Sequence, residues 1–98
     1  MKIIWTHEAL VQLEQIKNFI ANDSPNRAAQ FIQKIINQTN KISRNPRLGR
    51  IVSEISNPDI RELLFKNYRL VYRISGNHIE ILTVFEGHRL LRTHEIDN

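Results

Sequence analysis

Tyr68-Arg69-Leu70-Val71-Tyr72-Arg73 alternates large apolar side chains with arginines, and this segment decides the predicted fold. Successive side chains of a β-strand point to opposite faces of the sheet. One face then holds Tyr68, Leu70, Tyr72 and Ile74. The other holds Arg69, Val71 and Arg73. The first face suits a hydrophobic core, and we expect the second to display two guanidinium groups to an acidic partner.

Further β-type segments lie on both sides of this strand, at Ile51–Glu54, Ile60–Phe65 and Ile79–Glu86. The separators Lys66-Asn67 and Gly76-Asn77 are typical of two-residue β-turns. Such turns join neighbouring antiparallel strands, so we expect the last three strands to form a meander.

Two amphipathic helices are predicted between a short first strand at Ile3–Trp5 and this sheet. Thr6 suits the N-cap of a helix from about His7 to Ala21, and Ser24 caps a second helix in which Pro25 takes the first position. Apolar residues recur at helical spacing, at Ala9, Leu13, Ile16 and Ile20, then at Ala28, Phe31, Ile32, Ile35, Ile36, Thr39 and Ile42.

The element order predicts a single α+β domain over residues 1–98. An N-terminal strand precedes an antiparallel helical hairpin, which packs on one face of a three- or four-stranded antiparallel sheet in the order β-α-α-β-β-β. Neither helix can hide its apolar stripe alone, so both must cover the sheet. We expect the other sheet face to stay at least partly open, with Arg69 and Arg73 on it.

Composition narrows the classes of function. The chain has 14 basic and 10 acidic residues and a formal net charge of +4, which favours an acidic or nucleic-acid partner. It has no cysteine, which excludes disulfides and thiolate metal sites. The four histidines lack metal-site spacing, so we expect no metal and no cofactor. No apolar run reaches membrane length and no signal peptide is recognisable, so a cytoplasmic protein without a membrane partner is expected.

Several short motifs occur in an order that is more informative than each motif alone. They are Ile4-Trp5-Thr6-x-x-Ala9-x-x-x-Leu13-x-x-Ile16, Pro46-x-x-Gly49-Arg50-x-Val52-x-Glu54, Ile60-Arg61-Glu62-Leu63, Tyr68–Arg73, Ile79-x-Ile81-Leu82-x-Val84-Phe85 and His88-Arg89. In this order the chain resembles the RelE/ParE superfamily of bacterial type II toxins over nearly its whole length. The Ser24-Pro25 helix start and the Gly49–Glu54 segment look more like ParE.

The resemblance to ParE implies a toxin that inhibits DNA gyrase and is not itself an enzyme. It further implies a hetero-oligomer with a ParD-like antitoxin, whose DNA-binding domain alone reaches the operator DNA. Antitoxin contact is expected at Arg61, Arg69 and Arg73. The expected gyrase-binding residues lie near the C-terminus, where cations and leucines combine as in interface hot spots. They are His88, Arg89, Leu90, Leu91 and Arg92.

The RelE branch provides the alternative, a ribosome-dependent mRNA endonuclease. Cleavage would need a base, an acid and cations on the phosphate. In that case Glu54 is the base, His88 the acid, and Arg61 and Arg73 clamp the phosphate. No tyrosine or tryptophan follows Tyr72, and no lysine-rich active face is present, which favours the ParE prediction. A third alternative is an inactive homologue that serves as a binding partner.

Overall fold

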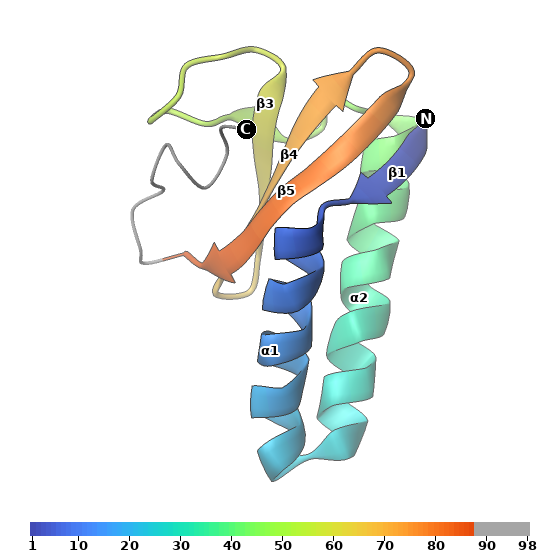
Figure 1. Ribbon diagram of the computed structural model, residues 1–98, viewed down its shortest axis with the longest axis vertical. Coiled ribbons are helices and arrows are strands. Elements are labelled where there is room, and N and C mark those ends of the chain that lie inside the picture. Colours follow the sequence, from blue (N-terminus) through green and yellow to red (C-terminus); the bar gives the residue numbers. More distant parts are fainter. Residues whose placement is uncertain (88–98) are drawn as a thin grey trace.

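The computed structural model describes residues 1–87 (Figure 1). Strand β1 (Lys2–Trp5) is followed by two helices, α1 (His7–Asp23) and α2 (Pro25–Arg44). The strands β2 (Arg50–Ile51), β3 (Ile60–Phe65), β4 (Tyr68–Ser75) and β5 (His78–Glu86) complete the fold. The predicted α+β architecture and element order are confirmed. Helix α1 extends two residues beyond its expected end at Ala21.

The sheet has five strands in the order β1-β5-β4-β3-β2. Strands β3, β4 and β5 form the predicted antiparallel meander, and Lys66 takes a positive φ of 55° in the first of its tight turns. Two details of the prediction were wrong. Strand β1 pairs in parallel with β5, so the sheet is mixed and has one strand more than expected. Strand β2 ends at Ile51, because the chain turns away from the sheet over the next residues.

Both helices begin at the predicted caps. The Thr6 hydroxyl oxygen accepts a hydrogen bond from the Ala9 amide at 3.2 Å, and the Ser24 hydroxyl oxygen accepts one from the Arg27 amide at 3.2 Å. These bonds satisfy amides that have no partner within the first helical turn. Ser24 also ends α1, so one residue separates the two helices and forces the hairpin.

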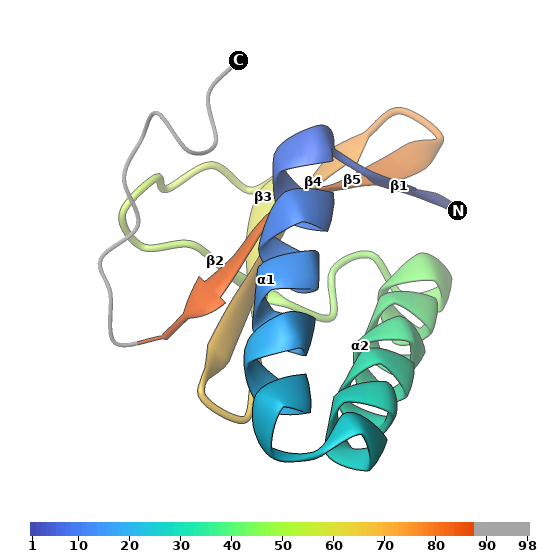
Figure 2. The ribbon, with the colours of Figure 1, turned by 60° about the horizontal axis from the view of Figure 1, so that its bottom comes forward.

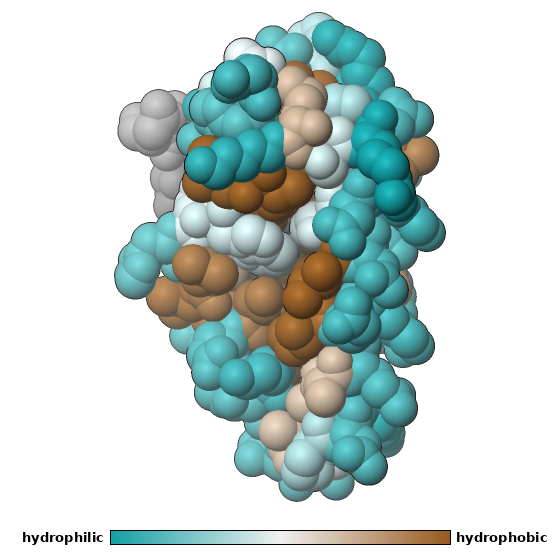
Figure 3. All heavy atoms as spheres, turned by 90° about the vertical axis from the view of Figure 1, so that its right-hand side faces the viewer, coloured by the Kyte–Doolittle hydropathy of each residue, from teal (hydrophilic) through white to brown (hydrophobic). Residues whose placement is uncertain are grey.

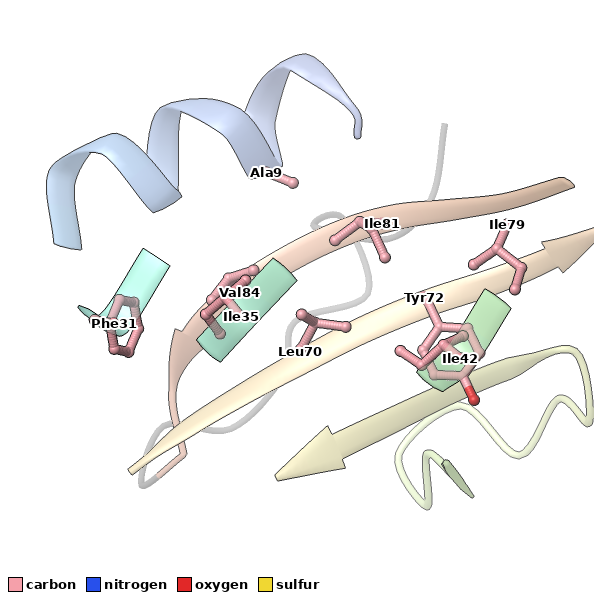
Figure 4. Packing of buried hydrophobic residues seen from close by; sticks show 9 residues of the cluster. All are labelled: Ala9, Phe31, Ile35, Ile42, Leu70, Tyr72, Ile79, Ile81 and Val84. Atoms are coloured by element: carbon pink, nitrogen blue, oxygen red, sulfur yellow. The ribbon is translucent and has the colours of Figure 1, made fainter. Parts of the chain in front are cut away.

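The helical hairpin covers one face of the sheet, and α1 and α2 lie side by side in opposite directions (Figure 2). The main core lies between these two layers. It contains Ala9, Phe31, Ile35, Ile42, Leu70, Tyr72, Ile79, Ile81 and Val84 (Figure 4). Leu70 and Tyr72 point to the helices, as the alternation of the deciding strand predicts. Burial of this apolar surface is the main source of stability.

A second, smaller cluster lies on the opposite sheet face. It contains Val52, Ile60, Val71, Leu82 and Phe85, with Ile55 packed against it. Val52 and Ile55 come from the segment between β2 and β3, which therefore covers part of the face that the sequence predicts to be open. Another side of the molecule, shown in Figure 3, carries hydrophobic side chains bordered by hydrophilic ones.

Candidate functional site

Arg69 on β4 lies inside a network of ion pairs. Its side chain donates from Nε to Glu62 Oε1 at 2.5 Å, and from Nη1 and Nη2 to the two Glu54 oxygens at 2.9 and 3.1 Å. The residue is 7% exposed. The hydrogen bonds to Glu54 and Glu62 raise the pKa of Arg69, although burial acts in the opposite direction. Arg69 therefore stays charged, and the expectation that it is displayed on an open face was wrong.

Glu62 on β3 is the acidic centre of the network. Its side chain is 3% exposed, and its second oxygen accepts a hydrogen bond from Arg50 Nε at 2.8 Å. The sheet register places Arg50 directly opposite Glu62. A buried carboxylate is tolerated when its partners are charged and well oriented. The network thus connects β2, β3, β4 and the covering segment that contains Glu54.

Arg61 holds a different part of the chain. Its side chain donates from Nε to the Pro58 carbonyl at 2.9 Å and from Nη1 to the Gly49 carbonyl at 3.0 Å. The Tyr72 hydroxyl accepts from the Gly49 amide at 2.9 Å and donates to the Pro46 carbonyl at 2.6 Å. Burial raises the pKa of the Tyr72 hydroxyl, which therefore stays protonated at neutral pH. Together these bonds secure the connection between α2 and β2.

Gly49 is required by this close packing. A Cβ atom at this position would lie 2.6 Å from the Glu62 carbonyl oxygen and 2.7 Å from the Tyr72 hydroxyl oxygen. The sequence motif that contains Gly49 and Arg50 therefore has a structural explanation within this chain. Gly49 lets the backbone approach β3, and Arg50 reaches Glu62.

The two residues of the predicted phosphate clamp point to opposite faces of the sheet. Residues directly opposite on antiparallel strands share a face. Arg61 lies opposite Tyr72, whose ring belongs to the helix-side core, whereas Arg73 lies opposite Ile60 of the second cluster. Arg73 also has Glu80 of β5 beside it, with Nε 3.9 Å from Oε1. The described residues thus do not bring Arg61 and Arg73 together.

The remaining predicted site residues fall into two groups. Glu54 has both carboxylate oxygens bonded to Arg69, so it is positioned as an ion-pair partner. The predicted acid, His88, and the predicted gyrase-binding residues lie outside the described residues 1–87. The contact of Arg61, Arg69 and Arg73 with an antitoxin remains a prediction.

The structure adds a groove between α1 and the ends of β4 and β5, with a volume of about 400 Å³. Phe19, 72% exposed, and Ile16 line it from α1, and Tyr68, Val84 and Phe85 line it from the sheet. We call it the α1–β5 groove. The sequence reasoning missed it, although Phe19 lies beside the apolar stripe of its helix and could have indicated a second contact surface.

The sheet edge beside the α1–β5 groove lacks a strand partner in the described structure. Strand β1 pairs with β5 only as far as Ile81. Beyond that point β5 is bonded to the side chain of Gln12 on α1. The Gln12 Oε1 atom accepts from the Val84 amide at 2.8 Å and from the Thr83 hydroxyl at 2.9 Å. An apolar floor next to a partly unpaired strand edge can accept a segment of another protein.

Within residues 1–87, no group of three or more histidine, aspartate or glutamate side chains could hold a metal ion. The helices of this region are also too short or too polar to span a membrane.

Comparison with known proteins gives three findings. Residues 3–91 match the family described as ParE toxin of type II toxin-antitoxin system, parDE. A protein of Sinorhizobium fredii (strain NBRC 101917 / NGR234), named "Putative toxin Y4kP", is 36% identical over 93 residues, which cover 90% of each chain. A solved structure titled "Chromosomal ParDE TA system from P. aeruginosa" superposes with a TM-score of 0.72 at 22% identity, covering 88% of this chain and 95% of the other.

Proposed function

Because this chain belongs to the ParE toxin family of type II toxin–antitoxin systems, we propose that it inhibits DNA gyrase without catalysing a reaction. A cognate antitoxin neutralises it in the cytoplasm, and the complex reaches operator DNA through the antitoxin. Family membership supports the antitoxin partner. The identity of the target, DNA gyrase, goes beyond family membership and is our proposal.

One observation carries the non-catalytic part of the proposal. Phosphodiester cleavage needs its acid, base and cations around one phosphate. Arg61 and Arg73 point to opposite faces, and Glu54 is bonded to Arg69 through both oxygens. Within residues 1–87 the predicted nuclease residues therefore act as ties within the fold, which favours a toxin that works by binding.

A supercoiling assay tests the gyrase proposal. Purified gyrase, relaxed plasmid and ATP are incubated with increasing amounts of the chain, and the negatively supercoiled product is quantified. We expect loss of supercoiling, and recovery when the cognate ParD-like antitoxin is added. In a parallel translation reaction, reporter mRNA should stay intact. Codon-positioned cuts in that mRNA together with normal supercoiling would establish the nuclease alternative instead.

One substitution separates catalysis from binding. Glu54→Gln removes the predicted base but keeps an oxygen that can accept from Arg69. We expect this variant to retain inhibition of gyrase within about threefold, far less than the loss expected on removal of a general base. Loss of toxicity with unchanged thermal stability and antitoxin affinity would contradict the proposal. His88→Ala does not make this distinction, because His88 is also a predicted gyrase-binding residue.

The α1–β5 groove is the antitoxin contact that we propose. Its apolar floor fits an amphipathic segment, and exposed aromatic residues are frequent hot spots of interfaces. Phe19→Ser should weaken antitoxin binding by about tenfold or more, equivalent to about 1.4 kcal/mol. Leu10→Ser is the matched control, because Leu10 is also exposed on α1 but does not line the groove. Equal effects of the two substitutions would place the antitoxin elsewhere.

A further inference from the structure

A second groove, of about 530 Å³, lies between α2 and the turn that joins β3 to β4. We call it the α2–β3 groove. Lys34, Lys41 and Arg44 line it from α2, and Lys66 lines it from the turn. Lys34 and Lys41 are seven residues apart, so they share a face of the helix about 10.5 Å apart along its axis. The sequence shows a basic run from Lys41 to Arg50, but only the fold joins its start to Lys34 and Lys66.

Four positive charges lie together in this groove. The other lining residues include no acidic side chain that could compensate them. A locally uncompensated charge of this kind attracts a polyanion.

Most other cations of residues 1–87 differ from the groove cations in their partners. The exceptions are Lys2, Arg27 and Arg61, which also form no ion pair. Lys17, Arg47, Arg50, Arg69 and Arg73 each have an acidic side chain within ion-pair distance. Within residues 1–87, by contrast, Lys34, Lys41, Arg44 and Lys66 form no ion pair. All four are exposed. Their charges are thus available to an external ligand.

We propose that the α2–β3 groove binds the phosphate backbone of duplex DNA. The toxin then adds its own DNA contact to that of the antitoxin, in contrast to the expectation from the family resemblance that only the antitoxin reaches DNA. Asn37, Gln38 and Asn40 supply amide donors between the cations, a combination that suits phosphate and sugar oxygens. Proteins that bind single strands also stack bases on aromatic rings. The one aromatic ring in this lining, Phe65, instead packs against Phe31 at a centroid distance of 5.9 Å. The groove therefore matches backbone contact with a duplex.

Salt-dependent binding of the purified full-length chain to a fluorescent random-sequence duplex of about 20 base pairs tests this proposal. Four phosphate contacts predict that log K falls with log salt at a slope of about −3.6. Lys34→Gln/Lys41→Gln should weaken binding and bring the slope closer to zero by about 2, since each lysine accounts for nearly one released counterion. Lys2→Gln/Lys17→Gln is the matched control, with the same loss of charge outside the groove, and should keep the slope.

Three results would overturn the inference. One is the absence of binding at 50 mM salt; a second is an equal change of slope in the two double variants, which would show a diffuse effect of net charge. The third is tighter binding of a single-stranded RNA of equal length, or of a glutamate-rich peptide of equal charge, than of the duplex. Because the chain alone is used, failure here leaves the gyrase proposal untouched, and a failed gyrase assay leaves this result intact.

Discussion

The outer sheet face and the α2–β3 groove both carry basic side chains, but they use them in opposite ways. On the sheet, Arg69 is 7% exposed and bonded to two glutamates. In the groove, Lys34 and Lys41 are exposed and have no acidic partner within residues 1–87. The first arrangement joins segments of the chain, and the second leaves charge available. Sequence clustering alone does not distinguish a structural cation from one that can bind a ligand.

Arg69→Ala should produce the largest effect on the sheet side of this comparison. It leaves Glu62 buried with only Arg50 as partner and releases Glu54 from the sheet. Breaking a buried ion pair costs about 3–5 kcal/mol, so we expect a loss of that size in the free energy of unfolding by urea. The double variant Arg69→Met/Glu62→Leu is the control and should recover much of the loss, because both deeply buried charges are removed. Arg50 and Glu54 then lose a partner, but their side chains are 64% and 24% exposed and stay in contact with water. A loss of unfolding free energy below about 1 kcal/mol in the single variant would show that Arg69 has no major structural role.

Tyr72→Phe should have the next largest effect. The substitution removes the hydroxyl that accepts from the Gly49 amide and donates to the Pro46 carbonyl. Leaving buried polar groups without a partner costs about 1–3 kcal/mol each, whereas the ring and its packing are retained. Urea unfolding measures the change. Tyr68→Phe provides the control at the half-buried tyrosine of the same strand and face. An equal loss of stability there would show that the two hydrogen bonds of the Tyr72 hydroxyl are not the cause of the effect.

The Tyr72 hydroxyl also predicts a pH dependence. Burial raises the pKa of this group above its ordinary value near 10. The folded state then holds the proton more tightly than the unfolded state, so this contribution is complete below about pH 10 and is lost as pH rises through the folded pKa. The stability difference between the wild type and Tyr72→Phe should therefore shrink as pH rises above about 10. A constant difference over that range would contradict the prediction.

Lys34→Gln/Lys41→Gln should have the smallest effect on stability. Both side chains are exposed and unpaired within the described residues, and surface substitutions of this kind usually change stability by less than about 0.5 kcal/mol. The same urea series measures it. A loss comparable to that of Arg69→Ala would show that the two lysines are structural cations as well. Unchanged stability together with weakened DNA binding would show that they serve a ligand and not the fold.

Local patterns predicted most of the fold correctly. The caps Thr6 and Ser24 and the Lys66-Asn67 turn involve residues within four positions of one another, and such contacts depend only on nearby residue types. The parallel pairing of β1 with β5 was missed, because it joins residues 76 positions apart. The candidate site was also harder to predict, because its residues are far apart along the chain. Glu54, Glu62 and Arg69 come from three separate segments, and Lys34 and Lys66 come from two.

The sequence by itself determined the alternation of Tyr68–Arg73, the two amphipathic helices, the family resemblance and the excess of four positive charges. Tertiary structure decided where the charges act. Strand register set Glu62 beside Arg50 and Arg69, so that mutual attraction offsets their desolvation. Packing of α2 beside the β3–β4 turn brought four cations together without an acid. Coulomb interactions depend on distance in space, which one-dimensional spacing does not supply.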